Sequence, residues 1–160
     1  VGTGAGFPGI PLNIVNNEAK YTLVDSLNKR IKFLDEIIDK LNLKNIETVH
    51  SRAEDFAKEN RETYDVATSR AVAALNVLLE YLLPLVKVGG LCICMKGSNV
   101  QEEIEASSNA LKILGGQIEK VEQITLPDSD IIRNIVIVRK VTKTSSKYPR
   151  KAGLPSKEPL

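Results

Sequence analysis

The stretch Val1-Gly2-Thr3-Gly4-Ala5-Gly6-Phe7-Pro8-Gly9 decides the fold class of this chain. Four glycines in nine residues, followed by an apolar segment, predict a tight turn between a strand and a helix. Glycine allows positive φ angles and lets a ligand approach the backbone closely. Free N–H groups at the start of the following helix favour an anionic or electron-rich group. The strand that should precede such a turn is not in the sequence, so we expect the natural protein to continue before Val1.

An acidic residue, Asp25, follows the turn at the distance expected of a carboxylate that accepts hydrogen bonds from ribose hydroxyl groups. The turn itself fits two patterns. Residues 4–9 match the G-x-G-x-x-G pattern of NAD-binding proteins, whereas residues 2–6 match the G-x-G-x-G turn of S-adenosylmethionine-dependent methyltransferases. Asp25 is also a good cap for the helix that follows it, although Ser26 can cap that helix instead.

The composition is that of one globular domain. The chain has 160 residues, 42% of them apolar, which is enough for a packed core. No segment is apolar enough to cross a membrane and no signal peptide is visible, so we expect a cytoplasmic protein without membrane contact. We also expect it to be a monomer. Cys92 and Cys94 lie in an apolar run, as expected of buried thiols in a reducing cytosol. With a single histidine they cannot readily form a metal site, and we predict none.

Strand-like runs alternate with helical patterns as far as residue 114, which predicts an α/β fold with a mostly parallel, doubly wound sheet. The apolar residues between Leu27 and Leu41 have helical spacing. The run of residues 91–96 suits the buried middle of a sheet, and Gly89-Gly90 before it predicts a turn. The predicted strands are residues 20–25, 46–50, 64–69 and 91–96, and the predicted helices are residues 27–41, 53–58, 77–83 and 100–114.

The pattern changes after residue 116. Residues 118–126 and 134–141 predict two strands joined by a turn at residues 127–130, and strands without a crossover helix are most simply antiparallel. From Arg139 onward, seven Lys or Arg residues stand against one acid. We therefore assign residues 1–141 to one domain and residues 142–160 to a basic tail without regular structure. Such a tail suggests a polyanionic partner, and the alternative is a tail that is merely solvated.

Two more stretches follow predicted strands, at the edge where ligands bind in open α/β sheets. Residues 51–55 offer backbone groups and a carboxylate that can reach an adenine edge, although acids are equally expected in the first turn of a helix. Arg70 follows the third strand and is expected at the mouth of the site. His50 has no Ser or Cys nucleophile paired with it, and we interpret it as structural.

Several stretches occur in the order found in one known family. They are residues 2–12, 24–30, 52–54, 69–73 and 133–134, and residues 147–153, which read Lys-Tyr-Pro-Arg-Lys-Ala-Gly. Together they resemble the bacterial ribosomal RNA small subunit methyltransferase G family, also called glucose-inhibited division protein B, from Val1 to Leu160. The glycine turn alone is a weak signal, but the turn combined with the terminal segment is specific.

The resemblance implies a class I, Rossmann-like methyltransferase fold that uses S-adenosylmethionine to methylate N7 of a guanosine in 16S ribosomal RNA or the small ribosomal subunit. It also implies a helical segment and a first strand before Val1. With the glycine turn, it gives ten expected donor-site residues. They are Gly2, Gly4, Gly6 and Phe7 at the turn, Asp25, Ser26 and Leu27 on the ribose side, Ala53 and Glu54 on the adenine side, and Arg70.

The residues agree with this chemistry. Guanine N7 carries a lone pair, so its attack on a sulfonium methyl group needs no general base, and positioning supplies most of the rate. No Asn/Asp-Pro-Pro-Tyr sequence follows the third strand, which argues against methylation of an exocyclic amine. We therefore name no catalytic acid or base. We expect Lys147, Arg150 and Lys151 to contact RNA phosphates, with strong dependence on salt.

Two other classes of function stay open at this point. An NAD(P)-binding oxidoreductase domain predicts further parallel βα units in place of the terminal hairpin, and no basic tail. A non-catalytic RNA-binding module predicts affinity for RNA without affinity for S-adenosylmethionine.

Overall fold

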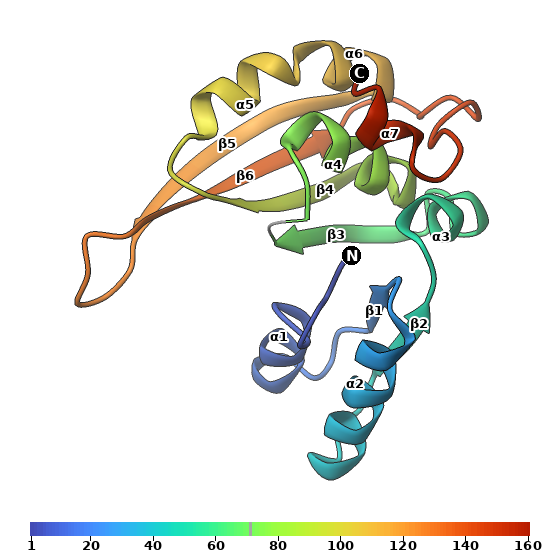
Figure 1. The fold of residues 1–160 in the computed structure, drawn as a ribbon, viewed down its shortest axis with the longest axis vertical. Helices are drawn as coiled ribbons and strands as arrows, with labels where there is room; N and C mark the ends of the chain where they lie inside the picture. The colour runs from blue at the N-terminus through green and yellow to red at the C-terminus, as the bar shows by residue number, and fades with distance from the viewer. Residues whose placement is uncertain (71) are drawn as a thin grey trace.

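The strands of the computed structural model, which describes residues 1–70 and 72–160, form two sheets (Figure 1). In the smaller sheet β1 (Tyr21–Asp25) pairs in parallel with β2 (Ile46–His50). The larger sheet has the order β3-β4-β6-β5. Its strand β3 (Tyr64–Arg70) is parallel to β4 (Val86–Lys96), whereas β6 (Ile132–Lys140) is antiparallel to both β4 and β5 (Gly116–Thr125). The predicted α/β class with a C-terminal antiparallel hairpin is confirmed.

Helices pack against both sheets (Figure 1). Against the smaller sheet lie α1 (Gly9–Val15) and the amphipathic α2 (Asn28–Lys40), and α3 (Ala53–Glu59) leads to the larger sheet. The larger sheet is covered by α4 (Leu75–Leu82), the 3-10 turn η1 (Leu83–Leu85), α5 (Val100–Ala106) and α6 (Ser108–Leu114). The short α7 (Leu154–Lys157) near the C-terminus contacts α4. In the part of the chain that the structure describes, no helix is long and apolar enough to cross a bilayer.

The main core lies between α4 and the larger sheet. Leu78, Leu79 and Leu82 of α4 have no exposed surface, and Cys92 and Val136 from β4 and β6 are equally buried. Each leucine buried in this way contributes about 1.5–3 kcal/mol to folding. Because this core fixes β3, β4 and α4 against one another, the loops at their ends start from rigid positions.

The glycine turn lies between the two sheets. The nitrogen of Val1 donates a hydrogen bond to the carbonyl of Thr68 in β3, at 2.8 Å. The amides of Gly2 and Thr3 both donate to the carbonyl of Val24 in β1, at 2.8 and 3.2 Å. Residues 1–3 thus join the carboxyl-terminal half of β1 to that of β3, and they place the turn where a ligand site is expected.

Two expectations about elements before residue 116 are wrong. The pair Gly89-Gly90 is not a turn but lies inside β4, because the register of β3 against β4 is irregular here and the backbone of Gly90 passes close to the carbonyl of Asp65. The single helix predicted for residues 100–114 is divided into α5 and α6. Its break is at Ser107, whose hydroxyl donates to the carbonyl of Glu103 at 2.6 Å, an alternative partner that disfavours a straight helix.

The C-terminal segment, residues 144–160, is more ordered than its composition indicates. Residues 154–157 form α7, although no regular structure was expected after residue 141. Arg61 donates hydrogen bonds to the carbonyls of Tyr148, Thr144 and Ser145, the latter two at 2.7 and 3.2 Å. The segment is therefore held against the domain by polar contacts that depend on residues far away in the sequence.

Candidate functional site

A cleft of about 1800 Å³ opens where the glycine turn meets the carboxyl ends of β1, β3 and β4. Nine of the ten residues expected at the donor site line this cleft, and Gly6 alone does not. The nine are Gly2, Gly4, Phe7, Asp25, Ser26, Leu27, Ala53, Glu54 and Arg70. The fold therefore brings together residues that lie up to 68 positions apart in the sequence.

The glycine turn has the backbone conformation that its composition indicates. Gly2, Gly4 and Gly6 have φ angles of 64°, 59° and 95°, a region that favours glycine. A Cβ atom added at Gly4 would have no neighbour within 4 Å in the part of the chain that the structure describes, so this part of the backbone is open to a ligand. Gly6 is buried under the turn, where such an atom would collide with Ile10. The adjacent hydroxyl of Thr3 is buried and has no hydrogen-bond partner within residues 1–70 and 72–160.

Asp25 ends β1 and is only 2% exposed. Its Oδ2 accepts a hydrogen bond from the amide of Gly4 at 2.9 Å and one from Arg30 at 3.3 Å, and its Oδ1 accepts the amide of Leu27 at 3.0 Å. The carboxylate therefore fixes the glycine turn and the entry to α2 while it also faces the cleft. Ser26 is exposed at the cleft, and no side chain caps α2.

Phe7 and Arg70 meet at the rim of the cleft. The guanidinium carbon of Arg70 lies 5.2 Å from the centre of the Phe7 ring, within the range of a cation–π contact. Both side chains are exposed, so the contact contributes about 0.5–1 kcal/mol. It joins the glycine turn to the end of β3.

Ala53 and Glu54 form the first turn of α3. Glu54 is 6% exposed, and its Oε1 accepts a hydrogen bond from the amide of Gly153 at 2.8 Å. A segment near the C-terminus therefore contacts an expected donor-site carboxylate directly. The sequence gives no signal for this pair, because the two residues are 99 positions apart.

The larger sheet supplies cleft residues to which the sequence analysis assigned no role. Lys96, at the end of β4, is 7% exposed, and its Nζ lies 2.7 Å from the carbonyl of Ala73 and 2.6 Å from Oε2 of Glu103. The side-chain amide of Asn134 donates to the carbonyl of Gly97 at 2.7 Å. A lysine at the end of an apolar strand is the signal that could have pointed to this part of the cleft.

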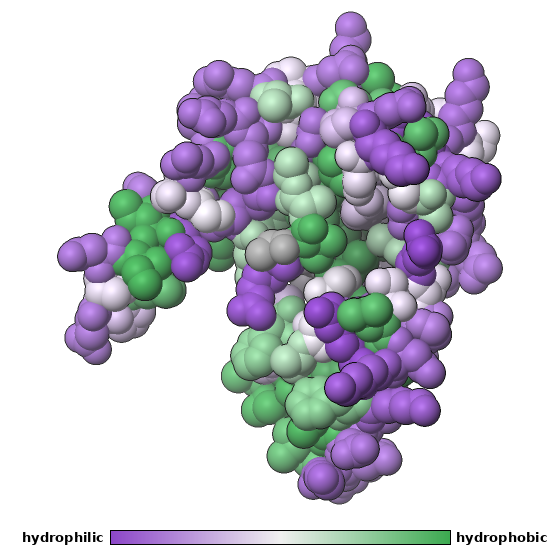
Figure 2. Space-filling view, viewed as in Figure 1, coloured by the Kyte–Doolittle hydropathy of each residue, from purple (hydrophilic) through white to green (hydrophobic). Residues whose placement is uncertain are grey.

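The β5–β6 hairpin reaches beyond the body of the molecule, and Figure 2 shows a cluster of hydrophobic side chains close to its polar end. Ile124, Leu126 and Ile131 are 42%, 38% and 46% exposed. Ile124 and Leu126 also belong to the lining of the cleft, together with Arg133 of β6. The hairpin therefore forms one border of the site.

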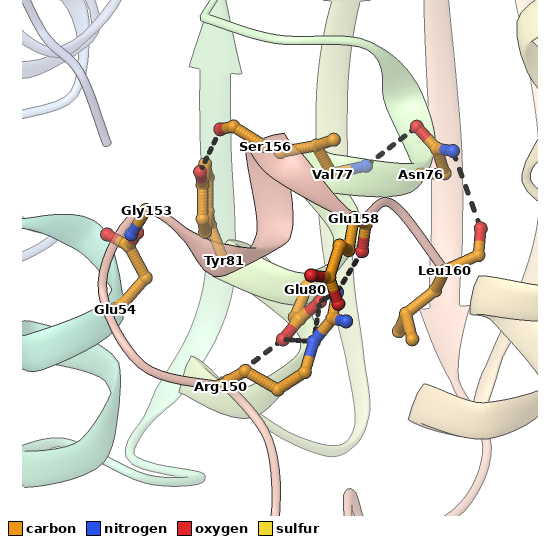
Figure 3. Close-up of polar contacts among 10 residues, drawn as sticks. All are labelled: Glu54, Asn76, Val77, Glu80, Tyr81, Arg150, Gly153, Ser156, Glu158 and Leu160. Atoms are coloured by element: carbon orange, nitrogen blue, oxygen red, sulfur yellow. Dashed lines mark hydrogen bonds and ion pairs between the residues drawn. The ribbon is translucent and has the colours of Figure 1, made fainter.

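The three basic residues expected to contact RNA differ in their surroundings. Lys147 and Lys151 are exposed. The guanidinium of Arg150 instead makes a bidentate ion pair with buried Glu80, with Nε–Oε1 and Nη2–Oε2 distances of 2.9 and 2.7 Å (Figure 3). These hydrogen bonds raise the pKa of Arg150 above its ordinary value. None of the three lines the cleft.

Cys92 and Cys94 are buried in β4, as predicted. Burial raises the pKa of the Cys94 thiol to about 12 and that of Cys92 well above its usual value, so both are protonated at neutral pH and are poor nucleophiles. Within residues 1–70 and 72–160, no group of three His, Cys, Asp or Glu residues could hold a metal ion.

Several solved structures with a similar fold are described as methylases or methyltransferases. An rRNA methylase from Streptococcus thermophilus aligns with 88% of this chain and 83% of its own, with a TM-score of 0.62 and 17% identity. The M. jannaschii TYW2 structure, solved in complex with AdoMet, aligns with 87% of this chain and 66% of its own, with a TM-score of 0.68 and 16% identity. At these identities the likeness shows the fold alone, which is that of the class I S-adenosylmethionine-dependent methyltransferases. The antiparallel β5–β6 pairing also departs from the further βα units expected of an oxidoreductase.

Sequence comparison is more specific. The model of the family GidB, rRNA small subunit methyltransferase G, matches residues 1–143. Curated relatives named ribosomal RNA small subunit methyltransferase G, from Acetivibrio thermocellus and Alkaliphilus metalliredigens, are 58% and 53% identical over the whole of this chain. The chain spans 66% and 68% of the length of these two relatives. Because both comparisons agree along the sequence, this chain belongs to the rRNA small subunit methyltransferase G family.

Proposed function

We propose that the protein transfers a methyl group from S-adenosylmethionine to N7 of a guanosine in 16S ribosomal RNA. Membership of the family supports the reaction class. The observation that carries the proposal for this chain is the open backbone at Gly4 beside the buried carboxylate of Asp25. The open backbone lets a small charged group approach the peptide closely, and the carboxylate at the end of the strand can accept hydrogen bonds from a ribose. The two features together suit a nucleoside that carries a small charged group.

The residues of the cleft fit the methyl donor. Asp25 would accept hydrogen bonds from the ribose hydroxyl groups, and Glu54 with the backbone of Ala53 would face the adenine. The hydroxyl of Thr3, a further residue of the cleft lining, is buried without a hydrogen-bond partner among the described residues. When bound, the donor supplies an electrophilic methyl group on a sulfonium centre.

The chain's own residues would orient the guanine. Lys96, Arg133 and Asn134 bring N–H donors to the cleft from the larger sheet, close to where Arg70 enters from β3. Donors of this kind suit the acceptor edge of guanine, which carries O6 and N7. Because N7 attacks with its own lone pair, orientation and exclusion of water suffice, and no residue need remove a proton.

Exposed lysines of the C-terminal segment would hold the RNA. Lys147 and Lys151 are exposed, and phosphate contacts by such residues give affinity that falls with salt. We assign Arg150 a different part, since its guanidinium is engaged by Glu80. We further propose that the protein acts as a monomer in the cytoplasm, where its RNA substrate is assembled into ribosomal subunits.

Calorimetry with S-adenosylhomocysteine and with NADH tests the choice of cofactor. Protein that contains residues 1–160 is expected to bind the first and not the second. Binding of NADH in its place would support the oxidoreductase reading. Binding of RNA without any binding of S-adenosylhomocysteine would support the non-catalytic RNA-binding reading instead.

A further inference from the structure

The C-terminal segment, here residues 144–160, forms part of the wall of the cleft. Gly153 and Ser156 of this segment line the cleft beside Glu54 and Tyr81. The hydroxyl groups of Tyr81 and Ser156 are 3.0 Å apart and share a hydrogen bond (Figure 3). A segment that the sequence presents as a basic tail is therefore a structural neighbour of the proposed donor site.

Glu80 is the centre of the contact that holds this segment. Its carboxylate is 1% exposed and accepts three hydrogen bonds at 2.9 Å or less from Arg150: from the backbone amide at 2.8 Å, from Nε at 2.9 Å and from Nη2 at 2.7 Å. Nη2 of Arg150 also donates to the carbonyl of Glu158 at 2.8 Å, so the same guanidinium joins two parts of the C-terminal segment (Figure 3). Arginine suits this task because its planar guanidinium fixes direction as well as charge.

Three residues beyond Arg150, the amide of Gly153 donates to Glu54. Gly153 has a φ angle of 83°, which turns the chain before α7. Glu54 therefore accepts a hydrogen bond from a backbone group three residues away from the arginine of the Glu80–Arg150 ion pair. A carboxylate that meets a ligand must be held in one rotamer to contribute its full interaction energy, and second contacts of this kind supply the constraint.

We propose that Glu80 and Arg150 are positioning residues for the methyl-donor site, which act through the Gly153 amide on Glu54. The inference rests on the proposed function, because it takes Glu54 to face the donor. Glu80 and Arg150 themselves touch neither donor nor RNA. Their loss frees the segment, lets Glu54 rotate and weakens donor binding without removing any group that contacts the donor.

The test measures the Kd of S-adenosylhomocysteine by calorimetry, and KM and kcat for methyl transfer to RNA, with protein containing residues 1–160. E80Q and R150K are expected to raise the Kd and the donor KM about tenfold, which is the ratio that corresponds to the loss of one charge-assisted hydrogen bond. Both variants are expected to keep kcat at saturating donor within about twofold of the wild-type value. R139A removes another Arg–Glu pair, with Glu119 on the exposed hairpin, and is expected to leave the Kd unchanged. R150K keeps a positive charge opposite Glu80, so it is expected to fold even if removal of the side chain is not tolerated.

Gly153→Ala provides a second variant without a change of charge. An added Cβ meets no atom of the described residues within 4 Å, but the positive φ is strained for alanine, so the variant disturbs the turn that directs the Gly153 amide. Its Kd is expected to rise in the same way. Because both perturbations act through one carboxylate, R150K and G153A are expected to have no further effect on Kd in a Glu54→Ala background.

Each result bears on one of the two proposals. Wild-type protein that binds no S-adenosylhomocysteine overturns the proposed function. Wild-type protein that binds it, together with E80Q, R150K and G153A variants that bind equally well, leaves the proposed function standing and overturns the positioning role. Additive effects of R150K and E54A would also overturn it, since they would show that Arg150 acts independently of Glu54.

Discussion

Replacement of Asp25 by asparagine is the sharpest test of how the cleft is built. The carboxylate accepts the amides of Gly4 and Leu27 at 2.9 and 3.0 Å, and Arg30 at 3.3 Å. An asparagine has one acceptor oxygen, and in its better orientation this oxygen serves Gly4 and Arg30. The NH2 group then faces the amide of Leu27, so one N–H loses its partner and the remaining bonds lose their ionic character.

The magnitude follows from these contacts. An unpaired, largely buried donor costs about 1–3 kcal/mol, and the weakening of the bond to Gly4 adds about 1 kcal/mol. Arg30 is half exposed and adds little. We therefore expect D25N to lose about 2–4 kcal/mol of unfolding free energy, which lowers Tm by about 4–16 °C in a domain of this size. The charged acceptor for the ribose hydroxyl groups is also lost, so the Kd of S-adenosylhomocysteine should rise about tenfold or more.

Thermal melting and calorimetry measure the two effects. Asp65→Asn is the matched control, because Asp65 is exposed and pairs with Lys87 at the surface, and its replacement should change stability by less than about 0.5 kcal/mol. A D25N variant that melts and binds donor like the D65N control would refute the role assigned to Asp25.

Three other predictions concern the tail, an ion pair and the thiols. A K147A/K151A double variant should lower RNA affinity and reduce the slope of log K against log salt by about two, as measured by filter binding at several salt concentrations; an unchanged slope would remove both lysines from the RNA interface. Burial opposes ionisation of Glu62, but Lys140 at 2.9 Å, the backbone of Thr144 and the charge of Lys143 together more than offset it and lower the pKa of Glu62. This stability is present above the unfolded pKa of about 4.5 and is lost as pH falls through the lower folded pKa. Glu62→Gln should thus lower the free energy of unfolding at pH 7 by about 1–3 kcal/mol. In an acid denaturation series, the difference in unfolding free energy between this variant and wild type should shrink below pH 4.5. Because burial raises the pKa of Cys94 to about 12, a thiol reagent at pH 8 should leave the native protein unlabelled and label it in urea; rapid labelling without urea would contradict the burial of β4.

The sequence predicted those parts of the molecule that are set by local rules. The glycine turn, Asp25 at the end of β1 and Arg70 at the end of β3 could be placed because strand ends converge on one edge of an α/β sheet. The antiparallel hairpin could be predicted because no helix separates its strands. These inferences need only periodicity, turn residues and the direction of strands.

The sequence could not predict contacts between segments that are far apart. Nothing local shows that Arg150 meets Glu80, 70 positions away, and the basic composition of its surroundings favoured a solvent-exposed arginine. Gly89-Gly90 was misread for a related reason, because glycine also serves where two strands approach closely. The break at Ser107 depends on a side-chain hydroxyl that competes with the helix backbone, which periodicity does not register.

One measurement tests the central claim most directly. Protein containing residues 1–160 is incubated with 16S ribosomal RNA and S-adenosylmethionine labelled in its methyl group, and the product is treated with borohydride and aniline, which cleave RNA at N7-methylguanosine. We predict that label enters the RNA and that cleavage appears at a single guanosine, with both signals reduced in the D25N variant. Label in the RNA without cleavage would show that the methyl group goes to another atom, and no transfer of label would contradict the assigned activity.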